Sequence, residues 1–163
     1  MHMENVQILG FRARIDSVGD TLKKVNSIKN DDEIIQLLNA DSIVSKNHIF
    51  HGVNQAFRAF ERGENLANDL SVEIVLRCSA QRQISKAFNI LGLKEGDVNL
   101  CAVVIGTSDY AQELSSIFTS DDDVLIPDYD LLVKTYKISE AELQRMSVEE
   151  IIIDRITKLA VDY

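Results

Sequence analysis

The sequence predicts an α+β fold, a single compact domain over residues 1–163 with a small, mostly antiparallel central sheet packed with about seven to eight helices. Two segments, residues 6–15 and 97–106, have the apolar patterns of strands. Much of the remaining chain repeats apolar residues at helical spacing. At 163 residues and 45% hydrophobic content, the chain has the size and apolar content of one domain.

The N-terminal part is expected to hold two strands and two helices. In the first strand, apolar and polar or small residues alternate from Leu9 onward. Asp16 or Ser17 is placed to cap the first helix. Ile43 and Val44 are apolar and β-branched, which favours a second strand around them. In chain order, we expect a strand at 6–15, a helix to about 26, a short helix at 33–39 and a short strand at 41–45.

The middle of the chain is expected to form a long helix, a helical hairpin and the central strand. The long helix begins at Ser45 or Asn47 and runs to Arg62, and Gly63 is placed to end it. Residues 71–96 follow as two helical runs that join at a small-residue break. The second run carries an apolar stripe of Ile84, Ala87, Phe88 and Leu91. The nearly continuous apolar residues 97–106 are typical of a central strand.

The C-terminal part is expected to add four helices and a brief edge strand. Ser108 is expected to cap a helix at 110–118, because the Gly106-Thr107-Ser108 turn lacks the Gly-Lys-Ser/Thr of a nucleotide site. Residues 124–126 are predicted as an edge strand that ends at Pro127. Three helices follow at 129–136, 139–146 and 147–162, and capping boxes open the last two at Ser139 with Glu142 and Ser147 with Glu150.

Composition predicts a cytoplasmic protein that does not bind membranes. No run of about 18 apolar residues occurs, and the N-terminus lacks the features of a signal peptide. Cys78 and Cys101 form no C-x-x-C pair, so we expect two buried thiols in a reducing compartment. The location is intracellular, and extends to the nucleus if the source is eukaryotic.

Charge is distributed unevenly along the chain. The net charge of −9 disfavours nucleic acid as a partner, because phosphate contacts dominate such affinities. However, residues 46–94 hold seven basic and four acidic residues, whereas residues 109–150 hold three basic and eleven acidic residues. One interpretation is two surfaces with different partners, and the other is ordinary solvated helix faces.

No pattern of catalytic, metal-binding or cofactor-binding residues is recognisable. The sequence contains no nucleophile elbow, Walker loop or Rossmann glycine set. His48 and His51 lie three residues apart on a predicted helix, but no third ligand accompanies them, which favours a structural role. We therefore expect no catalytic residue, no metal and no cofactor. The alternative is a protein that binds a small phosphorylated ligand, or an enzyme with an unrecognised site.

The helical hairpin resembles the signature of a known family. Its segment S-A-Q-R-Q-I-x-x-A-F-x-x-L-G-L-K-E-G is similar to the small subunit of the KEOPS complex, the TPRKB or Cgi family. The resemblance covers about residues 46–105 and extends more loosely to the C-terminus. The matching residues are Ser79, Ala80, Arg82, Gln83, Ile84, Ala87, Gly92, Leu93, Lys94 and Gly96.

The resemblance implies a noncatalytic subunit of the complex that helps to install threonylcarbamoyl on the adenosine beside the anticodon of tRNA. Members of this family dock directly on the N-lobe of the complex's small atypical kinase/ATPase. Through that kinase they are linked indirectly to the Kae/OSGEP subunit. They also bind the single-stranded 3′ CCA end of tRNA. On this interpretation the protein recruits tRNA, supports the kinase and catalyses nothing.

The predicted tRNA-binding residues surround the break in the hairpin. An arginine guanidinium can contact phosphates, base edges and base faces, which makes Arg82 and its neighbour Gln83 the first candidates. The alternative is that Arg82 caps the C-terminal carbonyls of the preceding helix. The full set is Arg82, Gln83, Arg77, Lys86, Arg58 and Arg62.

The C-terminal helix is the predicted kinase interface. Its apolar residues cover about 200° of its circumference, whereas a helix on one core needs little more than about 100°. One apolar edge is therefore expected to remain for a partner. The alternative is a helix buried on two sides by its own domain. The predicted interface residues are Ile153, Thr157, Ala160 and Ile156.

Overall fold

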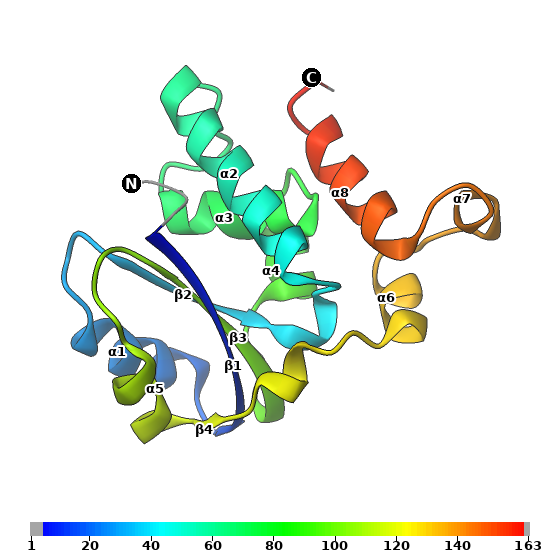
Figure 1. Cartoon of the computed structure of the whole chain (residues 1–163). Coiled ribbons are helices and arrows are strands. Elements are labelled where there is room, and N and C mark those ends of the chain that lie inside the picture. The colour runs from blue at the N-terminus through cyan, green and yellow to red at the C-terminus, as the bar shows by residue number, and fades with distance from the viewer. Residues whose placement is uncertain (1–4, 162–163) are drawn as a thin grey trace. The chain divides into compact units, whose positions relative to one another are not determined.

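The computed structural model describes residues 5–161 and confirms the predicted α+β class (Figure 1). Within these residues, eight α-helices accompany one four-stranded antiparallel sheet of order β2-β3-β1-β4. The chain divides into two units built from interleaved segments: Met1–Ala40 with Leu93–Ile126, and Asp41–Gly92 with Pro127–Tyr163. The single domain over residues 1–163 stays a prediction.

The first unit contains the sheet. The central strand β3 (Gly96–Ile105) pairs with β1 (Val6–Ile15) along its whole length and with β2 (Ile34–Asn39) on its other side. The predicted strands at 6–15 and 97–106 are therefore confirmed. The edge strand β4 (Thr119–Ser120) pairs only with Phe11 and Arg12 of β1.

One face of the sheet packs on two helices, α1 (Val18–Ile28) and α5 (Ala111–Ile117), as Figure 1 shows. Side chains alternate between the two faces of a strand, so every second residue of β1 contributes to this core. Phe11 of β1 contacts Phe118 with ring centroids 5.9 Å apart. Ser17 caps α1 as predicted, because its hydroxyl accepts the N–H of Asp20.

Two local predictions in the first half of the chain were wrong. Residues 33–39 form strand β2, not a helix, because pairing with β3 satisfies the backbone groups of this apolar segment. Periodicity alone does not distinguish a short buried strand from a buried helix. The expected strand at 41–45 is replaced by a 3-10 turn, η2 (Ala40–Ser42), after which Ile43 and Val44 are buried.

The segment before Pro127 also differs from its prediction. Residues 124–126 form no strand, because a 3-10 helix, η3 (Asp122–Leu125), follows β4. This segment lies directly against Gly10, whose N–H donates to Asp122 Oδ1 at 3.0 Å. A Cβ at position 10 would lie 2.8 Å from the carbonyl oxygen of Asp121, so only glycine permits this approach.

The Gly106-Thr107-Ser108 turn holds a carboxylate of the same chain. Ser108 does not cap α5; its N–H and hydroxyl both donate to Glu33, at 2.9 and 2.8 Å. The Tyr110 hydroxyl donates to the same carboxylate at 2.6 Å. The hydrogen bond from Tyr110, reinforced by those from Ser108, lowers the pKa of Glu33 to about 2. The turn therefore anchors Glu33, which is buried.

The second unit is helical, and its caps agree with the sequence. Ser45 caps the long helix, which ends at Gly63 in the left-handed conformation with φ of 68°. The capping boxes at Ser139 and Ser147 are both present. The last helix ends earlier than predicted, and residue 162 lies outside the described residues. The helices are α2 (Lys46–Arg62), α3 (Leu70–Ser79), α4 (Ile84–Leu91), α6 (Tyr129–Thr135), α7 (Glu140–Leu143) and α8 (Val148–Lys158).

A close contact between α2 and α3 depends on Gly52. A Cβ at this position would lie 2.3 Å from Cys78 Sγ and 3.0 Å from Cys78 Cα. The backbones of the two helices therefore approach too closely for any side chain. Both Cys78 and Cys101 are buried free thiols, as predicted.

We expect Gly52→Ala to lower the free energy of unfolding by about 1–3 kcal/mol, because α2 and α3 must separate to admit the methyl group. Urea denaturation checks this value. Gly19→Ala in α1 is the matched control. Its nearest neighbour would be Ser17 Oγ at 4.0 Å, so the helix gains propensity without a clash. A Gly52→Ala protein as stable as the wild type would contradict the close contact.

Candidate functional site

The predicted hairpin is confirmed, and it ends in a helix that is largely exposed. Ala80 adopts the left-handed conformation with φ of 56° and terminates α3. α4 begins after Gln83, whose side chain makes no capping bond. Only Ala87 and Leu91 of α4 are buried. Ile84 and Phe88, which the sequence places in the same apolar stripe, are 52% and 37% exposed.

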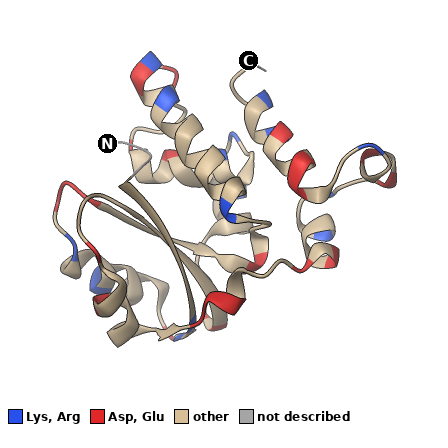
Figure 2. Ribbon diagram, viewed as in Figure 1, with Lys and Arg blue, Asp and Glu red and all other residues tan. Residues whose placement is uncertain are grey.

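Five of the six predicted RNA-binding residues are exposed. Arg82, Gln83 and Lys86 lie in the α3–α4 turn and the first turn of α4, while Arg58 and Arg62 lie near the C-terminal end of α2. Figure 2 shows basic residues on α2 and acidic residues on α7 and at the start of α8. The exposed cations of the hairpin and of α2 are therefore a candidate surface.

Arg77 does not belong to this surface. Its side chain is 3% exposed, and its Nε contacts Glu73 Oε2 at 2.7 Å one turn earlier on α3. The other oxygen of Glu73 accepts the N–H groups of Leu66 and Ala67, at 2.8 and 2.7 Å. The pair is thus a buried structural unit that holds the loop between α2 and α3, and the predicted RNA contact at Arg77 is corrected.

Arg82 makes a capping bond, but not with the helix that the sequence suggested. Its Nη2 donates to the carbonyl oxygen of Leu159 at 3.0 Å. Leu159 is the C-cap residue of α8, where a cation is favoured by the helix dipole. Arg82 therefore connects the α3–α4 turn to the end of α8.

The predicted apolar edge of α8 is half-covered. Ile153 and Ala160 are half-buried and Thr157 is exposed, but Ile156 is fully buried among Leu132 and other residues of the core. Ile156 is therefore corrected to a core residue. α8 lies beside α2, in agreement with Figure 1, and Thr157 of the edge contacts His51 of α2.

Two histidines of α2 make structural contacts. The Thr157 hydroxyl donates to the carbonyl of Ile153 at 3.1 Å, so His51 Nε2 is the donor in its 2.7 Å contact with Thr157. His48 is fully buried; its Nδ1 accepts the N–H of Val44 at 3.2 Å and its Nε2 lies 2.7 Å from the carbonyl oxygen of Cys78. Residues 5–161 contain no group of three or more metal-ligating side chains.

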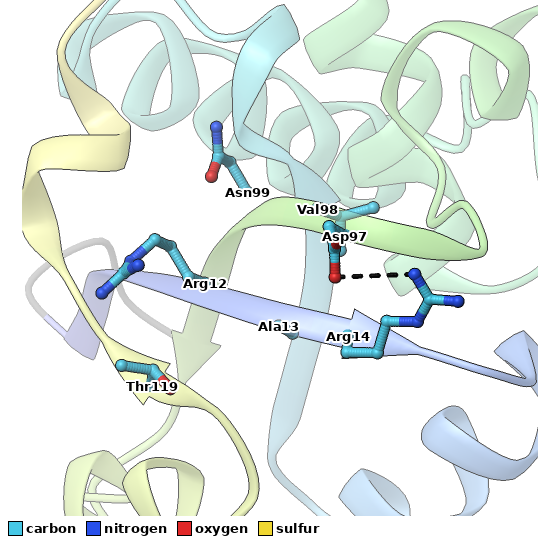
Figure 3. Close-up of a pocket in the computed structure, with 7 residues that line it drawn as sticks. All are labelled: Arg12, Ala13, Arg14, Asp97, Val98, Asn99 and Thr119. Atoms are coloured by element: carbon cyan, nitrogen blue, oxygen red, sulfur yellow. Dashed lines mark ion pairs between the residues drawn. The ribbon is translucent and has the colours of Figure 1, made fainter.

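A separate hollow of about 300 Å³ lies on the sheet of the first unit (Figure 3). Arg12 and Arg14 line it, but Arg12 pairs with Asp121 at 2.9 Å and Arg14 with Asp97 at 3.6 Å. Arg14 also pairs with Asp16 at 3.5 Å. Two cations among three carboxylates give no net attraction for an anion. No sequence motif marks these residues, because their arrangement depends on the register of the strands.

Comparisons with known proteins identify a family and a relative. The model of the family described as "Kinase binding protein CGI-121" matches residues 15–158. The "Regulatory protein Cgi121" of Methanocaldococcus jannaschii is 42% identical over 65 residues, which are 40% of this chain. The match spans 42% of the length of that relative.

Among residues 5–161, no helix is long and apolar enough to span a membrane.

Proposed function

Because the chain belongs to the CGI-121 family of kinase-binding proteins, we propose that it is a noncatalytic, regulatory subunit of a KEOPS-type complex that modifies tRNA. In this role it binds the small atypical kinase/ATPase of the complex directly and is linked to the Kae/OSGEP subunit through that kinase. It recruits tRNA by the single-stranded 3′ CCA end, to form threonylcarbamoyladenosine in the cytoplasm. The family description and the name of the relative support the kinase-binding and regulatory parts.

The recruitment of tRNA is supported by the exposed α4 segment. Residues 74–94 contain no acidic residue, and Arg82 and Lys86 are exposed within them. Single-stranded RNA is bound by cations along its backbone and by hydrogen bonds and stacking to its bases. We place the RNA surface on Arg82, Gln83 and Lys86, extended by Arg58 and Arg62 of α2.

We expect Arg82→Glu to weaken binding to a tRNA transcript roughly tenfold and to reduce the salt dependence of the affinity by about one counterion. Fluorescence anisotropy over a range of salt concentrations measures both. Arg82 also contacts Leu159, so Lys86→Glu provides an independent charge reversal on α4. Lys134→Glu on α6 is the control and leaves binding unchanged. If neither Arg82→Glu nor Lys86→Glu weakens binding, or if removal of the CCA end has no effect, the proposed RNA surface is wrong.

The half-covered edge of α8 is the proposed kinase contact, formed by Ile153, Thr157 and Ala160. We expect Ile153→Glu to abolish capture of the kinase subunit in a pull-down, because the complex would bury the new charge. The melting temperature of this variant should change by only a few degrees, since Ile153 is half-buried and lies outside the core. Ile156→Glu is the comparison: it places a charge in the core and should unfold the protein. Normal kinase capture by folded Ile153→Glu would contradict the assignment.

A further inference from the structure

α4 presents two large apolar side chains to solvent. Ile84 is 52% exposed and Phe88 is 37% exposed. They are four residues apart, so they lie one above the other on the same face of the helix. Residues Ser85 and Asn89, each one position further along, line the adjacent face and are also exposed. The apolar face of α4 is therefore flanked by a face that carries a hydroxyl and an amide group.

Gly92 leaves room for the ring of Phe88. A Cβ at position 92 would lie 3.1 Å from Phe88 Cδ1 and 2.5 Å from the Phe88 carbonyl oxygen. The ring thus packs closely over the glycine that ends α4, while part of its surface remains in solvent. An aromatic ring that is packed in place and still partly exposed is suited to stacking against a planar ligand.

The surroundings of this pair favour a nucleotide over a protein. An interface between two proteins usually buries about 800 Å² on each partner, far more than two side chains provide. A single nucleobase matches their size. In addition, Arg82 precedes the helix, Lys86 lies within it, and no acidic residue occurs from residue 74 to residue 94. This composition is complementary to a phosphate backbone.

We propose that Phe88, supported by Ile84, is a stacking platform for one unpaired base of a single-stranded RNA end. This inference rests on the proposed RNA-binding function and adds the residues that contact a base. The cations hold the phosphates on either side of that base, and Asn89 is placed to bond its edge. Stacking tolerates any base, because every base has a π face.

The test uses the full chain and a fluorescent single-stranded RNA that ends in CCA. We expect Phe88→Ala to weaken binding about tenfold and Phe88→Leu severalfold, because leucine keeps apolar volume but has no ring. Phe88→Trp should bind at least as tightly as the wild type. These variants leave the salt dependence unchanged, whereas Arg82→Glu reduces it. With an RNA whose unpaired 3′ nucleotides all lack bases, wild type and Phe88→Ala should bind equally.

The measurements distinguish failure of the stacking platform from failure of the RNA-binding function. If Phe88→Ala and Phe88→Leu bind the RNA as tightly as wild type while Arg82→Glu binds weakly, the platform is overturned and the RNA-binding function stands. If the wild-type protein does not bind the RNA, both are overturned. If the Phe88 variants lose the kinase in a pull-down but keep the RNA, the patch contacts protein instead. Melting curves of Phe88→Leu and Phe88→Trp, which keep a large apolar side chain at this position, show whether folding is retained.

Discussion

Glu73→Gln is expected to lower the free energy of unfolding by about 3–5 kcal/mol, because it breaks a buried ion pair from one side. Glu73 is fully buried, and its two oxygens together accept hydrogen bonds from Leu66, Ala67 and Arg77. In glutamine, one oxygen becomes an NH₂ group. In either orientation this donor faces another donor, and the Arg77 guanidinium loses its counter-charge. Urea denaturation at neutral pH measures the loss.

Two control variants show whether the loss of stability comes from the buried ion pair. Glu61→Gln, on the exposed surface of α2, should change the stability by less than about 0.5 kcal/mol. The double variant Glu73→Leu with Arg77→Met removes both charges and should be more stable than Glu73→Gln, because no unpaired charge stays buried. A Glu73→Gln protein within 1 kcal/mol of the wild type would show that the pair is hydrated or mobile.

His48 is expected to make the protein less stable as the pH falls from about 6.5 to about 4. Burial lowers the pKa of His48 from 6.5 to about 4 in the folded protein. Between these values the unfolded chain binds a proton that the folded protein does not. The contribution of neutral His48 to the free energy of unfolding is therefore fully present above pH 6.5. It is lost as the pH falls through the pKa of His48 in the folded protein. The free energy of unfolding falls by about 3 kcal/mol in total.

The hydrogen bonds of His48 explain the preference for the neutral ring. Nδ1 accepts the N–H of Val44, so a proton on this nitrogen would replace an acceptor with a second donor. Unfolding free energies at pH 7.5, 6.0 and 5.0 test the prediction. The lowered pKa values of Glu33 and Glu142, each about 2, affect stability only below about pH 4.5, so the window from 6.5 to 5 reports on histidine.

His48→Gln is the matched variant. It keeps a donor for the Cys78 carbonyl but does not titrate, so its stability should vary less between pH 7.5 and 5.0 than that of the wild type. His51→Gln should retain most of the wild-type dependence, because His51 is only partly buried. The assignment fails if His48→Gln and the wild type lose stability equally over this range.

Signals that act within a few residues were predicted well from the sequence. The serine caps at Ser17, Ser45, Ser139 and Ser147 are all present, as is the left-handed end of α2 at Gly63. A cap is decided by a side chain and a backbone group three residues away, so the sequence contains all of its parts. The family resemblance is of the same kind, since a short contiguous hairpin carries it.

Predictions that depended on distant partners failed more often. The sequence predicts a helix at 33–39, but this segment forms β2. It does so because it pairs with β3, whose residues lie far away in the chain. The sequence places Arg77 on the RNA surface by its position beside the hairpin break and Ile156 at the kinase interface by helical periodicity, but both are buried. Phe88 was placed in an apolar stripe and is partly exposed instead. Periodicity identifies the faces of a helix, but not which neighbours cover them.

The sequence by itself determined the fold class, the caps of most helices, the central strand and the membership of a family, because each follows from local hydrogen bonding, alternation of apolar residues or a contiguous motif. Only the tertiary structure decided that Glu73 and Arg77 form a buried pair, that Arg82 reaches Leu159 and that Phe88 remains in solvent. These features depend on which elements pack against each other, and burial then determines whether a charge or a ring serves the core or the surface.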